Sequence, residues 1–317
     1  MDFGFSLPTS GPMAAPDMLS AVARRGDELG FGFAGASDHI VIPRRIQSTY
    51  PYSPTGEFGS SGECLEQLTV LAFVAGVTSN LRLLTSVMVL PHRNPVHTAK
   101  ILSSIDVLSG GRMILGCGVG WMEEEFEALG APPYRDRGAV GDEYIRAFKE
   151  LWTSDDPSFD GEHVRFSDLA FEPKPVQKPH PPIWVGGESP QALRRAATLG
   201  DGWYPLGGNP RFPVGTAEQL SEAISRLHRY AEEAGRDPSD IDLTYSAGWD
   251  DTPDTRSRPA DERRPFTGPP EQVVADIHTF AEIGVRHMRV GFQGASLSET
   301  LDRMERFASD VAPLVQD

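Results

Sequence analysis

Residues 81–121 hold a strand, a helix and a second strand in one stretch, and this unit constrains the fold more than any other part of the chain. Leu81 to Val89 is an apolar run without polar alternation, which predicts a parallel strand covered on both faces. Asn94-Pro95 predicts a helix start and Gly110-Gly111 its end. Because Met113 to Cys117 is a second short apolar strand, the segment predicts a βαβ unit.

Strands and helices alternate along the rest of the chain. Strands are expected at 2–7, 31–37, 81–89, 113–117, 183–186, 202–205, 241–247 and 286–292. Helices are expected at 16–29, 64–78, 122–129, 139–152, 189–199, 216–235, 270–283 and 297–309, besides the one that begins at Asn94. Eight strands that alternate with helices favour a closed (β/α)₈ TIM barrel over an open sheet. The lack of a G-x-G-x-x-G fingerprint after the first strand and of a P-loop supports this choice. A single domain over residues 1–317 accounts for the length.

Charge and composition limit the classes of partner that the protein is expected to bind. The net charge is −16, and the basic residues form no stripe that would follow a phosphate backbone, so no nucleic-acid partner is expected. No run of about 18 apolar residues occurs, and the amino terminus lacks a basic flank, so we expect no membrane partner and a cytoplasmic protein. Cys64 lies in an expected helix and Cys117 in an expected strand, so both are predicted to be reduced thiols in the core.

The active site of such a barrel lies at the carboxyl ends of its strands. These ends carry small, polar and aromatic residues, which suit a flat ring with a phosphate tail. The long connections 40–62 and 250–269 follow strands and are expected as insertions on this ligand face, the second being a candidate lid. Residues 155–181 run from helix to strand, which places them on the opposite, structural face.

Three segments carry a family resemblance: LGFGFAGASDHIVIP (29–43), RNPVHTAKILSSIDVLSGGRMILGCGVGW (93–121) and PPIWVGGESPQALRRAATLGDGWYP (181–205). Together with the closing helix, they resemble the bacterial luciferase-like family of flavin- and deazaflavin-dependent oxidoreductases, whose members have a luciferase-like monooxygenase domain. The resemblance implies an α/β barrel that binds FMN or coenzyme F420 at the strand carboxyl ends. TSV at 85–87 resembles the F420-dependent branch.

The resemblance assigns cofactor contacts to two places. Gly186, Gly187, Glu188 and Ser189 resemble the family's phosphate grip, in which glycines precede a helix whose free N–H groups favour an anion. The alternative is an ordinary N-cap after a tight turn, and the Glu188 carboxylate would repel phosphate unless it points outward. Ser86-Val87 matches a non-proline cis peptide that bulges against the ring, with a plain buried strand end as the alternative.

Further cofactor contacts are expected at Gly118 and Val119, which end a strand, and at Trp203, which ends another and either flanks the ring or packs in the core. Trp249 has the same two alternatives.

Asp38-His39 is the best catalytic candidate. A histidine at a strand end can pass a proton while a hydride moves to or from the ring. Asp38 has three alternative roles: it caps the following loop, orients a neighbouring side chain or contacts the cofactor. The alternative is a hydrogen-bonded structural histidine. Some deazaflavin dehydrogenases of the family have Trp soon after this His, and Glu where this chain has Trp121. This chain has Ile42-Pro43 after the His, so their sugar-phosphate mechanism does not transfer.

The remaining titratable residues suggest no further site. There is no H-E-x-x-H or C-x-x-C motif, so no metal is expected. His92 either reaches the pocket or is exposed to solvent. Arg135 and Arg137, near Asp136 and Asp142, are expected to form surface or inter-helix ion pairs.

These observations predict an oxidoreductase that transfers a hydride between F420 and a small organic substrate. One alternative is an FMN-dependent monooxygenase using reduced flavin and O₂. A second is a non-catalytic flavin- or deazaflavin-binding protein. A homodimer is plausible from the family and from the apolar residues Leu71, Phe73 and Val74, unless these pack inside.

Overall fold

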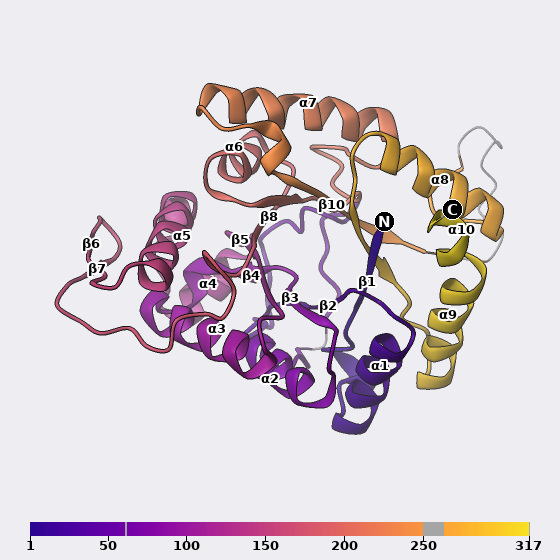
Figure 1. Cartoon of the computed structure of the whole chain (residues 1–317), viewed down its shortest axis with the longest axis horizontal. Helices are drawn as coiled ribbons and strands as arrows, with labels where there is room; N and C mark the ends of the chain where they lie inside the picture. The colour runs from indigo at the N-terminus through magenta and orange to yellow at the C-terminus, as the bar shows by residue number, and fades with distance from the viewer. Residues whose placement is uncertain (61, 250–262, 317) are drawn as a thin grey trace.

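The computed structural model describes residues 1–60, 62–249 and 263–316. Parallel strands form a closed barrel in the middle of the molecule, with helices around it (Figure 1). The sheet runs in the order β3-β2-β1-β11-β10-β9-β8-β5-β4, and a β3–β5 pairing closes it. The strands are β1 (Asp2–Ser6), β2 (Phe33–Ala36), β3 (Arg82–Thr85), β4 (Met88–Val89), β5 (Met113–Gly118), β8 (Ile183–Gly186), β9 (Gly202–Tyr204), β10 (Asp242–Gly248) and β11 (His287–Gly291). This confirms the TIM barrel, with β3 and β4 sharing one strand position.

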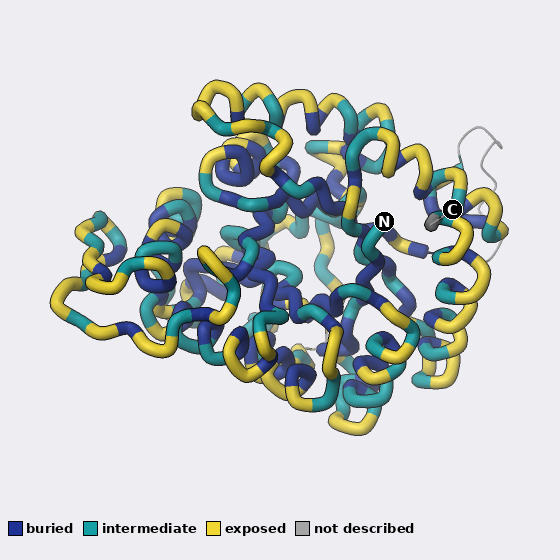
Figure 2. The backbone as a smooth tube through the Cα atoms, in the orientation of Figure 1, coloured by how far each residue is buried: buried dark blue, intermediate teal, exposed yellow. Residues whose placement is uncertain are grey.

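The helices of the outer layer follow the expected alternation. They are α1 (Pro16–Glu28), α2 (Gln67–Val77), α3 (Pro95–Ser109), α4 (Glu123–Leu129), α5 (Arg137–Thr153), α6 (Pro190–Leu199), α7 (Ala217–Glu233), α8 (Pro270–Glu282), α9 (Leu297–Asp310) and α10 (Ala312–Gln316). Buried residues concentrate on the strands and on the helix faces turned toward them, while exposed residues lie on the outside (Figure 2). No helix among these residues is both long and apolar enough to cross a membrane.

Two separate apolar cores result from the alternation of side chains along the strands. The larger one fills the space between strands and helices. The smaller one lies inside the barrel and consists of Phe33, Leu84, Ile114, Trp184 and Tyr204. Because alternate residues of one strand face the same side, this inner core shows which positions further along each strand face the barrel interior.

Some element boundaries differ from the prediction. The expected strand 81–89 is interrupted after Thr85, and α2 begins at Gln67 because the Glu66 side chain caps it by accepting from the Thr69 N–H at 2.7 Å. Cys64 therefore precedes the helix rather than lying in it. Cys117 lies in β5, and both cysteines are free thiols.

The segment 155–181 holds one element that the sequence did not predict, an antiparallel pair of short strands, β6 (Phe159–Asp160) and β7 (Arg165–Phe166). Further along, the Gln177 amide binds the Asp106 carboxylate and the Met113 carbonyl, each at 2.7 Å. Met113 begins β5, so this part of the segment lies at the amino ends of the strands, as expected.

Two expectations about surface segments have different outcomes. Most of the candidate lid, residues 250–262, lies outside the described residues. Of the three apolar residues considered as dimer surface, Leu71 and Val74 are fully buried in the core, and only Phe73 is exposed.

Candidate active site

The barrel interior is lined by small residues at the carboxyl ends of the strands, which we call the mouth. Gly35 and Gly186 follow Phe33 and Trp184 by two residues, so they face the interior one step above the inner apolar core. Ser6, Gly118 and Ser246 occupy the corresponding inward positions of β1, β5 and β10. Ser6, Gly118 and Gly186 are only partly buried, so solvent reaches this layer.

The peptide bond between Ser86 and Val87 is cis, as the resemblance implied. A Cβ built on Gly118 or on Gly186 would lie 3.0 Å from a Val87 methyl group. A Cβ on Gly35 would lie 2.9 Å from the Ser86 Cβ. Glycines on three strands therefore make room for the bulge between β3 and β4. We call Ser86, Val87, Gly118 and Gly186 the floor of the mouth.

Tyr204 also belongs to this region, although the sequence analysis selected its neighbour. The Tyr204 hydroxyl and the Ser86 hydroxyl lie 3.0 Å apart and share a hydrogen bond. Trp203 points the other way, into the core between strands and helices, and is 1% exposed. Its indole N–H donates to the Gly187 carbonyl at 2.8 Å. Trp203 thus supports the turn that follows β8 instead of lining the mouth.

That turn leads into the amino terminus of α6. Gly187 has a φ of +99°, which favours glycine, and the Ser189 hydroxyl caps the helix by accepting from the Ala192 N–H at 3.2 Å. Pro190 is the first helical residue. The local geometry therefore satisfies the N-cap interpretation. Because Pro190 has no N–H and the Ala192 N–H is bound by Ser189, Gln191 has the first-turn N–H that is left for an anion.

The Glu188 carboxylate is bound by loops rather than directed at these N–H groups. It accepts from the Leu206 N–H at 2.8 Å, from the Asn209 amide at 2.9 Å and from the Tyr52 hydroxyl at 3.4 Å. Burial raises the pKa of this carboxyl, and the hydrogen bonds only partly oppose the shift. Glu188 therefore ties the 40–62 and 205–215 connections to the end of β8.

His39 is hydrogen-bonded to a carboxylate that the sequence analysis missed. The His39 Nδ1 lies 2.9 Å from the Oε2 of Glu125, in the first turn of α4. The other oxygen, Oε1, accepts from the Ile40 N–H at 2.8 Å, and Glu125 is 1% exposed. Burial tends to raise the pKa of Glu125, but the hydrogen bond with His39 and the nearby histidine charges hold it below its usual value. Glu125 is therefore an ionised partner for His39 at neutral pH.

Aromatic rings surround this pair. The His39 ring lies 5.1 Å from that of Phe58 and 6.5 Å from that of Trp121, measured between centroids. Tyr50 packs on Trp121 at 4.9 Å. Tyr50 and Phe58 come from the 40–62 connection, so this insertion brings apolar surface to the histidine. We call the His39–Glu125 pair, these three rings and the Glu188 contacts the rim of the mouth.

Asp38 is buried and engaged with another element. Its carboxylate forms a two-point ion pair with the Arg93 guanidinium, with both N–O distances 2.7 Å, and accepts from the Val89 N–H at 2.8 Å. Arg93 also binds Glu66 at 2.9 Å. These contacts hold the ends of β2 and β4 together, while any contact of Asp38 with a cofactor stays a prediction.

His92 is buried beside the same glutamate. Neither ring nitrogen has a hydrogen-bond partner among the described residues, and Nδ1 lies 3.9 Å from the Glu125 Oε1. Burial lowers the pKa of His92, and Glu125 only partly offsets this effect. Of the two alternatives for this side chain, exposure to solvent is wrong, because the ring is buried. It packs on Phe126, with ring centroids 4.6 Å apart.

The two arginines at the start of α5 have different partners. Arg135 pairs with Asp136 at 3.6 Å and is 86% exposed in its side chain, as expected. Asp142 pairs with Arg195 instead. Arg137 stacks on the Tyr134 ring at 3.9 Å and donates to the Gly120 carbonyl at 3.3 Å, without an ion pair to any described acidic residue. Its guanidinium therefore contacts the turn that follows β5.

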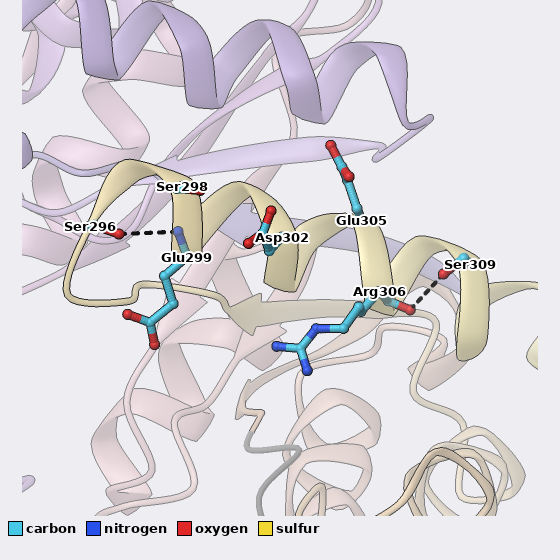
Figure 3. Close-up of a pocket in the computed structure, with 7 residues that line it drawn as sticks. All are labelled: Ser296, Ser298, Glu299, Asp302, Glu305, Arg306 and Ser309. Atoms are coloured by element: carbon cyan, nitrogen blue, oxygen red, sulfur yellow. Dashed lines mark hydrogen bonds between the residues drawn. The ribbon is translucent and has the colours of Figure 1, made fainter.

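A pocket lined by His92, Arg93 and Tyr144 lies between the connection after β4 and α5. A polar groove runs along the outside of α9, and its lining includes Ser296, Asp302 and Arg306 but none of the candidate residues (Figure 3). Within the described residues, no group of three or more His, Cys, Asp or Glu side chains is arranged to hold a metal ion.

Comparison with known proteins identifies the family. The model for the luciferase-like monooxygenase family matches residues 1–249. An uncharacterised protein of Mycobacterium tuberculosis is 35% identical over 217 residues, covering 68% of this chain and 72% of that protein. The FMNH₂-dependent dimethylsulfone monooxygenase of Pseudomonas putida is 37% identical over 146 residues, which cover 45% of this chain and 40% of that enzyme.

Among solved structures, an F420-dependent secondary alcohol dehydrogenase in complex with an F420-acetone adduct superposes with a TM-score of 0.78 at 18% identity, covering 100% of this chain and 99% of that one. The same barrel fold thus occurs in an F420-dependent dehydrogenase, and the sequence relatives include an FMNH₂-dependent monooxygenase. The match to a monooxygenase family supports an enzyme. This chain belongs to the luciferase-like monooxygenase family.

Proposed function

We propose that the protein is an oxidoreductase that transfers a hydride between coenzyme F420 and a small organic substrate at the mouth of the barrel. The observation that carries the proposal is the His39–Glu125 hydrogen bond, because it orients a group that can handle a proton just after the carboxyl end of β2. A relative that uses FMNH₂ supports FMN-dependent monooxygenation as a second candidate.

The residues of the mouth fit a flat ring with an anionic tail. Val87 is partly exposed and stands between Gly118 and Gly186, so it offers a ring an apolar surface. The start of α6, after Gly186 to Ser189, offers a phosphate the Gln191 N–H and the positive end of the helix dipole. Arg137, held at the turn after the adjacent strand β5, adds a cation on that side.

His39 is suited to hold or deliver a proton at Nε2. An ionised carboxylate only accepts hydrogen bonds, so Glu125 requires a proton on the His39 Nδ1. This tautomer leaves Nε2 as the basic nitrogen when the ring is neutral. The side chain of His39 is 18% exposed, so it is accessible to a ligand from the solvent side. When bound, F420 supplies two-electron hydride transfer, whereas reduced FMN supplies electrons to O₂.

Binding titrations of the protein with F420 and with FMN, followed by absorbance and fluorescence, test the proposal. We expect the protein to bind F420 tightly and to take up no oxygen when the reduced cofactor is present. Tight binding of FMN with oxygen uptake would instead support the monooxygenase, and binding of neither cofactor would contradict both candidates.

Two histidine variants test the assignment of His39. We expect His39→Ala to bind the cofactor within about threefold of wild type and to lose about 10²–10⁴ in turnover of an accepted substrate. His97→Ala is the matched control, since His97 is exposed on α3. Unchanged turnover with His39→Ala would refute its catalytic role, and cofactor binding without turnover in wild type would support a non-catalytic binding protein.

A further inference from the structure

Arg289 is a charged side chain on the inner wall of the mouth. In β11, Met288 and Val290 belong to the outer core, so His287 and Arg289 face the barrel interior. His287 lies in the lower layer, where its ring packs against that of Trp184 at 5.0 Å. Arg289 lies one step above it, at the level of the floor, because it pairs in register with Ser246 on β10.

The Arg289 guanidinium is held by neutral hydroxyl groups. Its Nη1 donates to the Ser6 Oγ at 2.6 Å, and its Nη2 and Nε donate to the Ser246 Oγ at 2.5 and 3.1 Å. The Cδ passes 3.3 Å from where a Gly35 Cβ would lie. A guanidinium has five N–H groups, and three of them account for these bonds. The side chain is therefore fixed in position while two N–H groups remain for a further acceptor.

The Arg289 guanidinium has no carboxylate partner among the described residues. Arg93 and Arg263, which are also partly buried, pair with carboxylates within 4.0 Å. Other partly buried arginines, such as Arg112 and Arg236, donate to backbone carbonyl oxygens instead. A desolvated charge without a counter-charge is costly. The cost is notable in a chain with a net charge of −16, which has many carboxylates to place. An anion bound at the mouth would supply the counter-charge.

The Arg289 charge acts on a residue of the 40–62 connection. Burial raises the pKa of Tyr50, and the positive charge of Arg289 partly opposes this rise. Tyr50 therefore lies within electrostatic reach of Arg289, and it packs on Trp121 at the rim.

We propose that Arg289, positioned by Ser6 and Ser246, binds the carboxylate of the organic substrate, so that the substrate class is small organic acids. The inference rests on the proposed function only in placing the substrate at the mouth. A planar guanidinium matches a carboxylate better than a point charge does, because two parallel N–H groups meet two oxygens. The aromatic rings of the rim offer apolar surface to the remainder of such a molecule.

The test uses two carboxylates, benzoate and propionate, and their neutral isosteres, benzamide and propionamide. Isothermal titration calorimetry is performed on wild type, Arg289→Met, Arg289→Lys and Arg286→Met, with and without saturating F420 or FMN. Arg286 is exposed immediately before β11 and serves as the matched control. Circular dichroism and thermal melting establish that each variant is folded.

We expect at least one carboxylate to bind wild type, to bind Arg289→Met at least about tenfold more weakly, and to bind Arg286→Met unchanged. Arg289→Lys, which keeps the charge without the planar fork, is expected between them. The amides should bind weakly and equally to all four proteins. Should Arg289→Met fail to fold, the Arg289→Lys comparison decides the question.

Equal carboxylate affinity in wild type and both Arg289 variants would overturn the proposal, as would no carboxylate binding to wild type. Loss of cofactor affinity in Arg289→Met with carboxylate binding unchanged would overturn it too, since Arg289 would then serve the cofactor. Arg289-dependent carboxylate binding in a protein that binds neither cofactor would support the anion site and refute the proposed function, so the two failures are distinguishable.

Discussion

The floor and the rim of the mouth are built in different ways. The floor consists of backbone positions on paired strands, where Gly118 and Gly186 accept Val87 between them. The rim consists of side-chain hydrogen bonds between connections, such as His39 with Glu125 and Glu188 with Asn209. Strand pairing holds the floor rigidly, whereas a few side-chain hydrogen bonds hold the rim. We therefore expect substitutions in the floor to affect folding and cofactor binding. Substitutions in the rim should affect the chemical step and the order of the loops.

The largest effect is expected next to the floor, at Gly116. A Cβ on Gly116 would lie 2.0 Å from the Thr85 carbonyl oxygen, a backbone atom of the neighbouring strand. We expect Gly116→Ala to lower the free energy of unfolding by about 3 kcal/mol or more, as measured by urea denaturation. Gly76→Ala on α2 is the control, because its Cβ meets no atom within 4 Å and a helix gains from alanine. A loss of less than about 1 kcal/mol for Gly116→Ala would contradict a tightly built floor.

At the rim, Glu125→Gln removes the charge that orients His39. We expect turnover to fall about 10²-fold, since a neutral amide no longer requires the proton on the His39 Nδ1, while cofactor affinity stays within about threefold. Steady-state kinetics and cofactor titration measure the two quantities. Glu123→Gln, exposed in the same helical turn, should leave turnover unchanged. If both variants behave alike, the pair has no role in proton handling.

A smaller effect is expected where the rim connects two loops. Asn209→Ala leaves the Glu188 Oε2 buried without its hydrogen-bond donor, which costs about 1–3 kcal/mol. We expect faster amide hydrogen exchange over 205–215, measured by mass spectrometry, with unchanged exchange in the strands. Asn80→Ala, at an exposed position, is the control. Faster exchange throughout the barrel would show that the loop and the floor are one cooperative unit.

The smallest effect concerns His92 and acid stability. Its pKa is lowered in the folded state, so below about pH 6.5 the unfolded chain takes up a proton that the folded chain does not. Stability therefore falls as the pH falls through this range. His92→Leu should reduce the slope of unfolding free energy against pH by up to about 1.4 kcal/mol per pH unit, and His97→Leu should not. Identical slopes in both variants and wild type would exclude this role for His92.

The sequence predicted the floor better than the rim. Gly118 and Gly186 end strands of a parallel barrel and Ser86-Val87 directly follow the end of β3, and such ends converge whatever the loops do. Glu125 lies 86 residues from His39, and nothing in the run Glu123 to Glu125 distinguishes the buried glutamate from its neighbours. Contacts of this kind depend on the conformation of the loops, and the pattern of apolar residues along the sequence does not predict that conformation.

Two further residues were missed for a different reason. β9 has only three residues and carries aromatic side chains at both Trp203 and Tyr204, so alternation could not decide which of them faces inward. Arg289 interrupts an otherwise apolar strand end, and an arginine there was a usable signal, because a charge facing the interior of a barrel needs a partner.

The central claim is that the floor holds the cofactor and the rim performs the chemistry. F420 and FMN titrations of wild type, Gly186→Ala and His39→Ala test it most directly. Because a Cβ added at Gly186 would displace Val87, we predict about tenfold weaker binding for Gly186→Ala and a change of less than about threefold for His39→Ala. Binding unaffected by Gly186→Ala but lost with His39→Ala would contradict the account.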